Sequence, residues 1–153
     1  MLKEITGDMV ADENIRVIVR DGYRSGMPDT DFTRELYERY PKIKRSDEEN
    51  IAEKGLSGSI GSMGGAKLED GRMVITWYLG EEADGDVDFD DVVRVANMFN
   101  QYIDAKGLPG DVGIPEGMGG EQWNTVKQAV GEIANLHPEY DFYIVKSSEG
   151  KDE

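Results

Sequence analysis

The chain has 153 residues, with 32 acidic side chains against 17 basic ones, and its formal net charge is −15. This length is sufficient for one domain with a sizeable hydrophobic core. Direct binding of nucleic acid is not expected, because phosphate contacts need clustered lysine and arginine. A basic protein partner suits such a surface better. The absence of cysteine excludes disulfides and thiolate chemistry.

The termini and apolar runs predict a cytoplasmic protein without a membrane anchor. The first ten residues contain no basic segment followed by a long apolar run. No stretch approaches the roughly 20 apolar residues of a membrane span. A single histidine cannot supply a histidine-rich metal site, and we expect neither a metal nor a cofactor. His137, which precedes Pro138, is predicted at a helix end instead.

Six segments have the composition of strands. Five are rich in β-branched or aromatic residues, and one is rich in glycine and precedes a hairpin turn with the sequence Asp-Gly. In chain order they are Leu2–Thr6, Ile15–Arg20, Ser59–Leu68, Met73–Leu79, Asp111–Pro115 and Tyr140–Lys146.

Three amphipathic helices are predicted between these strands. The first places apolar residues at a four-residue spacing from Phe32 to Tyr40, with Asp29 or Thr30 as its cap and Pro41 closing it. Residues 42–58 are polar and are predicted to form a surface excursion, with at most a short helix around residues 47–54. The second helix spans Phe89–Lys106. Its predicted buried face comprises Phe89, Val92, Val93, Ala96, Phe99 and Ile103, and Gly107 ends it.

The third helix follows a glycine turn and opens at Glu121. Its predicted buried residues are Trp123, Val126, Val130 and Ile133. The aspartates before the second helix could indicate a calcium-binding loop. However, the glycine and the closing glutamate do not fall at the EF-hand spacing. Asp88 is therefore predicted as a helix cap.

This order of elements predicts an α/β fold. Helices that alternate with buried strands favour a mostly parallel central sheet covered by helices on both faces. We expect a single domain over residues 1–146. The acidic tail, residues 147–153, is predicted to be disordered.

Three turns that contain glycine follow predicted strands: Gly7-Asp8, residues 21–28 and Gly117–Gly120. If the strands are parallel neighbours, these turns meet at one edge of the sheet. Backbone amides there can bind phosphate, and the Asp8 carboxylate can accept a hydrogen bond from an exocyclic amine. Such a site would suit a nucleotide diphosphate. The alternative is that the glycines only allow sharp turns and close packing.

Several side chains near these turns allow two interpretations. Arg20 and Arg24 can bind phosphate, or they can pair with Asp21, Asp29 or Asp31 on the surface. Asp21 can act as a general base on a water, or it can be an ordinary loop carboxylate. Aromatic residues in the strands can stack on a base or can fill the core. They are Tyr23, Trp77 and Tyr78.

Taken together, the ordered motifs resemble a divergent macrodomain, in particular the small stand-alone macrodomain-like proteins of bacteriophages. The motifs are Ile5-Thr6-Gly7-Asp8-Met9, the helix that ends in Glu38-Arg39-Tyr40-Pro41, the strand Val74-Ile75-Thr76-Trp77-Tyr78, and Ile114-Pro115 followed by Gly117–Gly120 and Trp123. The resemblance implies a three-layer fold and binding of ADP-ribose.

The resemblance also implies roles for individual residues. Asp8 would bind the adenine amine, with the Met9 backbone beside it. Gly26 would lie in the first loop, near the distal ribose. The second loop would cradle the diphosphate, and it comprises Gly117, Met118, Gly119 and Gly120.

The first loop departs from the family pattern. No asparagine follows the second strand, and Asp29 and Asp31 occupy positions where the family has glycines. Carboxylates at these positions would repel a diphosphate. Three functions remain open: binding of ADP-ribose or a related nucleotide, which would sequester or degrade a nucleotide signal; an acidic protein-interaction or inhibitor module; and hydrolysis of ADP-ribosyl groups or ADP-ribose 1″-phosphate, with Asp21 as the base.

Overall fold

The computed structural model describes residues 2–54 and 60–147, which build a six-stranded sheet. The strands are β1 (Leu2–Gly7), β2 (Ile15–Tyr23), β3 (Ser62–Lys67), β4 (Met73–Gly80), β5 (Asp111–Pro115) and β6 (Phe142–Ser147). Their order in the sheet is β1-β6-β5-β2-β4-β3, and every neighbouring pair is parallel except β3 with β4. The predicted mostly parallel sheet is confirmed.

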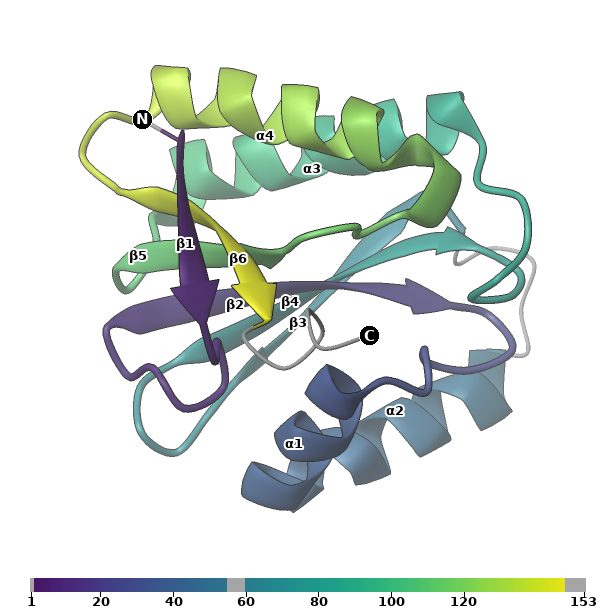
Figure 1. The fold of residues 1–153 in the computed structure, drawn as a ribbon. Coiled ribbons are helices and arrows are strands. Elements are labelled where there is room, and N and C mark those ends of the chain that lie inside the picture. Colours follow the sequence, from purple (N-terminus) through teal and green to yellow (C-terminus); the bar gives the residue numbers. More distant parts are fainter. Residues whose placement is uncertain (1, 55–59, 148–153) are drawn as a thin grey trace.

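Helices cover both faces of this sheet (Figure 1). One face carries α1 (Asp31–Arg39) and α2 (Pro41–Lys54), and the other carries α3 (Phe89–Lys106) and α4 (Trp123–Leu136). A short 3₁₀ turn, Gly120–Gln122, precedes α4. The chain therefore has the three-layer α/β architecture that its sequence predicts.

The central strands supply both halves of the core because successive side chains of a strand point to opposite faces. On β2, Val17 and Val19 pack in the cluster beneath α3 and α4, whereas Ile18 packs in the cluster beneath α1. On β4, Ile75 and Val74 divide in the same way. All five side chains are buried. Burial on both faces explains why these two strands contain the apolar runs Val17–Val19 and Met73–Ile75.

Local capping fixes where the first and third helices begin. The Thr30 hydroxyl accepts a hydrogen bond from the Thr33 amide at 3.2 Å, so Thr30 rather than Asp29 caps α1. Asp88 caps α3 by accepting from the Asp90 amide at 3.0 Å. Both helices thus start where the sequence predicts.

The predicted surface excursion over residues 42–58 is wrong for residues 42–46, whereas the short helix predicted around residues 47–54 forms the second half of a longer helix. Helix α2 begins at Pro41, which suits the first helical position because its missing N–H would have no partner there. Ile43 and Asp47 of this helix are buried against the sheet. Residues 55–58 lie outside the described residues, as does Ser59 of the predicted hairpin strand.

The predicted buried face of α3 needs one correction. Phe89 and Val93 are 54% and 38% exposed, whereas Val95, which was not predicted, is fully buried. With 3.6 residues per turn, Val95 shares a face with Val92 and Phe99, and Val93 falls at its rim. Of the predicted acidic tail, Ser147 belongs to β6 and residues 148–153 lie outside the described residues. No helix in the described part of the chain is long and apolar enough to cross a membrane.

Candidate functional site

A cavity of about 240 Å³ lies at the carboxyl ends of β2, β5 and β6. This is the edge at which parallel α/β sheets bind ligands. The lining residues are Asp21, Pro28, Thr30, Phe32, Thr33, Pro115, Glu116, Gly117, Met118, Val145 and Ser147. Of the residues that the sequence nominated, Asp21, Gly117 and Met118 therefore meet in one place. The others, Asp8, Met9, Arg24, Gly26, Gly119 and Gly120, do not line this cavity.

The glycine loop that follows β5 has a backbone conformation that explains its composition. Gly117, Gly119 and Gly120 have φ angles of +86°, +83° and +57°, which side-chain-bearing residues rarely adopt. A Cβ atom added at Gly119 would also lie 3.0 Å from a methyl group of Val126. The loop therefore needs glycine at these positions for its own folding, whether or not it binds a ligand.

Three amides of this loop already have acceptors within the protein. The Met118 amide donates to the Pro115 carbonyl at 3.2 Å, and the Gly120 amide donates to the Gly117 carbonyl at 3.0 Å. The Gly119 amide donates to the Asp21 carboxylate at 3.2 Å. Of these three amides, that of Gly119 donates to a side chain, and the other two donate to backbone carbonyls.

Asp21 is held by a second donor. The Tyr23 hydroxyl, on the same strand, donates to the same carboxylate oxygen at 2.7 Å. Burial raises the pKa of Tyr23, and the negative charge of Asp21 and the hydrogen bond raise it further. Tyr23 therefore remains a neutral donor throughout the physiological range. A carboxylate fixed by two donors at the end of a strand is an ordered acceptor within the cavity.

Asp8 stabilises its own turn. Its carboxylate accepts hydrogen bonds from the Val10 amide at 3.0 Å and the Ala11 amide at 3.1 Å. Burial alone would raise the pKa of Asp8, but hydrogen bonds from Glu35 and these two amides outweigh it and hold the pKa below its usual value. The side chain is exposed, and the neighbouring Met9 is buried. Its predicted contact with an adenine amine stays a prediction.

The two arginines that can bind phosphate have other partners. Arg20 is buried and makes two hydrogen bonds to the Asp47 carboxylate, at 2.8 and 2.7 Å. Arg24 pairs with Glu81, its Nε donating at 3.0 Å. Both arginines are paired, but not with Asp21, Asp29 or Asp31 as predicted, and the Arg20 pair is buried rather than on the surface. Gly26 closes the turn after β2, and its amide donates to a backbone carbonyl at 3.2 Å.

The aspartates of the first loop face a different cation. Asp29 and Asp31 both pair with Arg34 on the surface, and neither lines the cavity. The described residues that do line it include two carboxylates, Asp21 and Glu116, and no lysine or arginine. Lys146, at 3.7 Å, pairs with Glu116. The lining is consequently acidic.

The aromatic residues divide between the core and the cavity. Trp77 is fully buried and meets Phe99 edge to face, with ring centroids 5.8 Å apart, and Tyr23 is also buried. The core interpretation is correct for these two. Phe32 instead is half-buried and lines the cavity, which the sequence did not indicate because Phe32 shares the apolar stripe of α1 with the buried Leu36.

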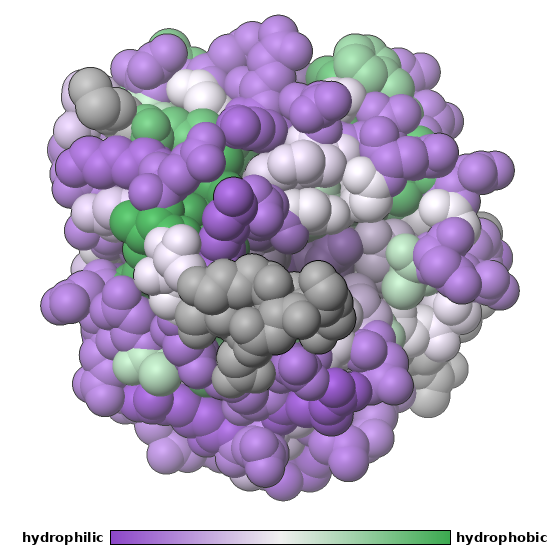
Figure 2. Space-filling view, viewed as in Figure 1, coloured by the Kyte–Doolittle hydropathy of each residue, from purple (hydrophilic) through white to green (hydrophobic). Residues whose placement is uncertain are grey.

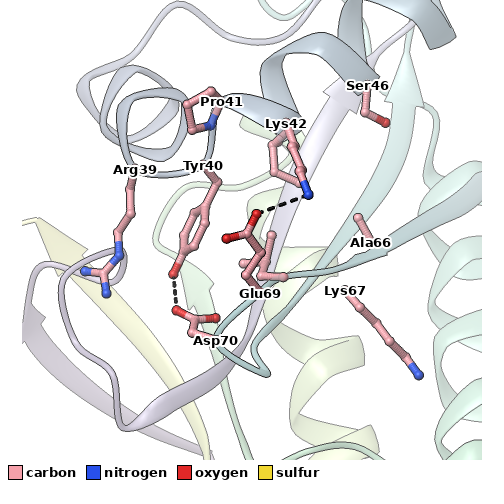
Figure 3. Close-up of a pocket in the computed structure, with 11 residues that line it drawn as sticks. Arg39, Tyr40, Pro41, Lys42, Ser46, Ala66, Lys67, Glu69 and Asp70 are labelled. Carbon is pink, nitrogen blue, oxygen red and sulfur yellow. Dashed lines mark hydrogen bonds and ion pairs between the residues drawn. The ribbon is translucent and has the colours of Figure 1, made fainter.

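A second cavity, of about 360 Å³, lies at the opposite edge of the sheet, between the α1–α2 junction and the β3–β4 hairpin (Figure 3). Lys42 pairs with Glu69 at 3.1 Å, and the Tyr40 hydroxyl donates to Asp70 at 2.7 Å. Lys67 points away from these pairs in Figure 3. The second cavity contains none of the nominated residues. Among the described residues, no group of three or more histidine, aspartate or glutamate side chains is placed to hold a metal ion.

Comparison with known proteins gives matches at the level of structure. No protein-family model and no curated protein matches the sequence. The macrodomain of Mycobacterium tuberculosis DarG is similar with a TM-score of 0.76 at 17% identity, covering 95% of this chain and 97% of that one. An Oceanobacillus iheyensis macrodomain with ADP has a TM-score of 0.71 at 16% identity, with coverages of 97% and 84%.

A third solved structure, Thermosipho africanus DarTG in complex with ADP-ribose, has a TM-score of 0.68 at 12% identity. The match covers 96% of this chain and 42% of that one. The three-layer arrangement of sheet and helices defines an α/β protein with a cavity at the carboxyl ends of its strands. More specifically, the chain has the macrodomain fold, as its sequence motifs predict.

Proposed function

We propose that the cavity at the carboxyl edge, lined by Asp21, Phe32 and the glycine loop, binds ADP-ribose or a related nucleotide. The observation that carries the proposal is the composition of the cavity lining. A half-buried aromatic ring, Phe32, and the glycine-loop residues Gly117 and Met118 line the same cavity. Solved proteins of the same fold with ADP-ribose or ADP support it.

Each side of the cavity suits a different part of a nucleotide. The Phe32 ring can stack on a base, which contributes about 1–3 kcal/mol where it has been measured at nucleic-acid sites. The left-handed glycines let a phosphate or ribose approach the loop backbone closely. Thr30 and Thr33 also line the cavity and carry hydroxyl groups. Asp8 and Met9 would contribute to the adenine end, as the family resemblance implies.

Isothermal titration calorimetry with ADP-ribose, ADP and adenosine tests this function. We expect binding of at least one of them at micromolar concentrations, weakened about tenfold or more in Phe32→Ala because stacking is lost. Leu136→Ala is the control, because Leu136 is 65% exposed and ends α4 far from the glycine loop (Figure 1). Absence of heat with every nucleotide at high micromolar concentration would contradict the proposal.

A second candidate function is an acidic surface that binds a basic protein. The loop of residues 81–86 is exposed throughout and contains four carboxylates, and Figure 2 shows a mostly hydrophilic surface on the face that it draws. Such binding should weaken steeply as salt rises. Replacing Glu81, Glu82, Asp84 and Asp86 by their amides should abolish salt-sensitive capture of a basic partner. Equal capture by this variant would rule out the loop as the binding surface.

Turnover is the third candidate, with Asp21 as a general base on a water at the distal ribose. The support for it is the position of the Asp21 carboxylate in the cavity. Asp21→Ala should then reduce hydrolysis of ADP-ribose 1″-phosphate or of ADP-ribosyl groups by at least a hundredfold. Unchanged turnover would remove this assignment. A role in a bacteriophage, in sequestering or degrading a host nucleotide signal, follows from the family resemblance.

A further inference from the structure

The contact between Asp21 and Gly119 joins the carboxyl end of β2 to the glycine loop after β5, between residues that are 98 positions apart in the sequence. Gly119 is buried, and both it and the following Gly120 have left-handed backbone conformations. The neighbouring Met118 and Gly120 amides donate to backbone carbonyls, so the Gly119 amide is the donor of these three that meets a carboxylate. The carboxylate of Asp21 accepts from this amide at 3.2 Å. The loop thus already holds an anion that belongs to the protein.

The charges around this contact do not favour a second anion. Neither lysine nor arginine is among the described residues that line the cavity, whereas Glu116 adds another carboxylate. The arginines near the first loop are committed to other acids: Arg20 to Asp47, Arg24 to Glu81 and Arg34 to two aspartates. These pairs are fixed by hydrogen bonds. A phosphate at Gly119 would meet the Asp21 charge without a lysine or arginine among the described lining residues to offset it, since the nearby Lys146 pairs with Glu116.

We propose that Asp21 is an internal anion that sets the ligand preference of this cavity, competing with phosphate for the Gly119 amide and favouring an uncharged, hydroxyl-bearing group there. This inference rests on the proposed function, since it concerns the same cavity. The carboxylate oxygens accept hydrogen bonds from ribose hydroxyls, but they repel phosphate oxygens. Asp21 is in this account a specificity-determining residue, and its role requires no chemical step.

The variant Asp21→Asn separates the effect of the Asp21 charge on binding from the effect of its side-chain shape. The amide side chain has the same size and keeps an oxygen that can accept from Gly119 and from the Tyr23 hydroxyl, so the turn keeps its partners. Asp29→Asn is the matched control, because it removes the same charge from the segment between β2 and α1. The Asp29 side chain is 90% exposed, pairs with Arg34 and does not line the cavity.

Inorganic pyrophosphate is the first probe, followed through the NMR shift of the Gly119 amide. We expect D21N to reach half-saturation at a pyrophosphate concentration at least tenfold lower than the wild type, and D29N to stay within twofold of it. Equal responses of D21N and the wild type would overturn the inference, as would a Gly119 amide that does not shift in D21N. If D21N does not fold, Asp21→Ser provides the same comparison with a smaller neutral side chain.

Calorimetry with ADP-ribose and adenosine separates this inference from the function on which it rests. D21N should bind ADP-ribose about tenfold more tightly, while its affinity for adenosine stays within twofold. If pyrophosphate responds as expected but no variant binds a nucleotide, the proposed function is wrong and the role of Asp21 stands. If nucleotides bind equally to wild type and D21N and pyrophosphate shows no difference, the role of Asp21 is wrong and the proposed function stands.

Discussion

Replacing Asp47 by alanine should destabilise the protein strongly, because Asp47 joins α2 to the sheet through a buried ion pair. Its carboxylate accepts two hydrogen bonds from Arg20 and a third, at 2.7 Å, from the Tyr37 hydroxyl. The side chains of Arg20 and Asp47 are only 6% and 4% exposed. Burial alone would lower the pKa of Arg20, but the hydrogen bonds and charge of Asp47 raise it, so the guanidinium stays charged.

The magnitude follows from what Asp47→Ala leaves behind. The buried Arg20 cation would keep Thr76, which accepts from its Nε at 2.7 Å, but would lose its carboxylate partner. Removing one member of a buried pair typically costs about 3–5 kcal/mol. For a domain of this size, that corresponds to a fall in Tm of about 6–20 °C. Because total stability is about 5–15 kcal/mol, the loss is a large fraction of it.

Urea unfolding followed by circular dichroism measures this loss. Asp29→Ala is the control, since it removes the same side chain from an exposed ion pair, and its unfolding midpoint should match the wild type. The double variant Arg20→Leu/Asp47→Leu should be more stable than Asp47→Ala, because no unpaired charge remains buried. A loss below about 1 kcal/mol in Asp47→Ala would refute the reasoning.

Two further predictions concern the loop and the hairpin. Gly119→Ala should destabilise the fold by about 1–2 kcal/mol, measured by urea unfolding, because it places a side chain in a left-handed conformation; no change would mean that the loop can rearrange. Burial raises the pKa of Asp70, but the Tyr40 hydrogen bond, the Arg72 amide and nearby arginines outweigh it and lower the pKa. Asp70 therefore stabilises the fold above its unfolded pKa of about 3.9, and this contribution disappears as the pH falls through the lowered folded value. The stability difference between wild type and Asp70→Asn should shrink from pH 6 to pH 3, and a constant difference would contradict this.

Much of the fold could be predicted from the sequence because its strongest signals are local. The apolar runs of β2 and β4 are buried on both faces, as their composition indicates. Side chains that cap helices are also local, and Asp88 caps α3 as predicted. The sequence predicts only the second half of helix α2, around residues 47–54. Its first half has no apolar period that would indicate a helix. Its anchor is the Asp47 pair with Arg20, and a contact between residues 27 positions apart leaves no local pattern.

The sequence could predict at which edge of the sheet the candidate site lies. It could not predict the hydrogen bonds that the residues of this site make. Parallel strands bring their following loops to one edge, which places Asp21 and Gly117 together. The sequence does not show that the Gly119 amide is already occupied, because its partner lies 98 residues away. The sequence also does not single out Phe32 as a lining residue, because the apolar spacing of a helix does not reveal which of its residues meets a cavity.

A crystal structure of the protein soaked with ADP-ribose tests the central claim most directly. We predict electron density for the nucleotide in the cavity at the carboxyl edge, with the base against Phe32 and a ribose near Asp21 and Gly117. Density confined to the second cavity, beside Tyr40 and Glu69, would contradict this account. A carboxyl-edge cavity without ligand at millimolar ADP-ribose would contradict it equally.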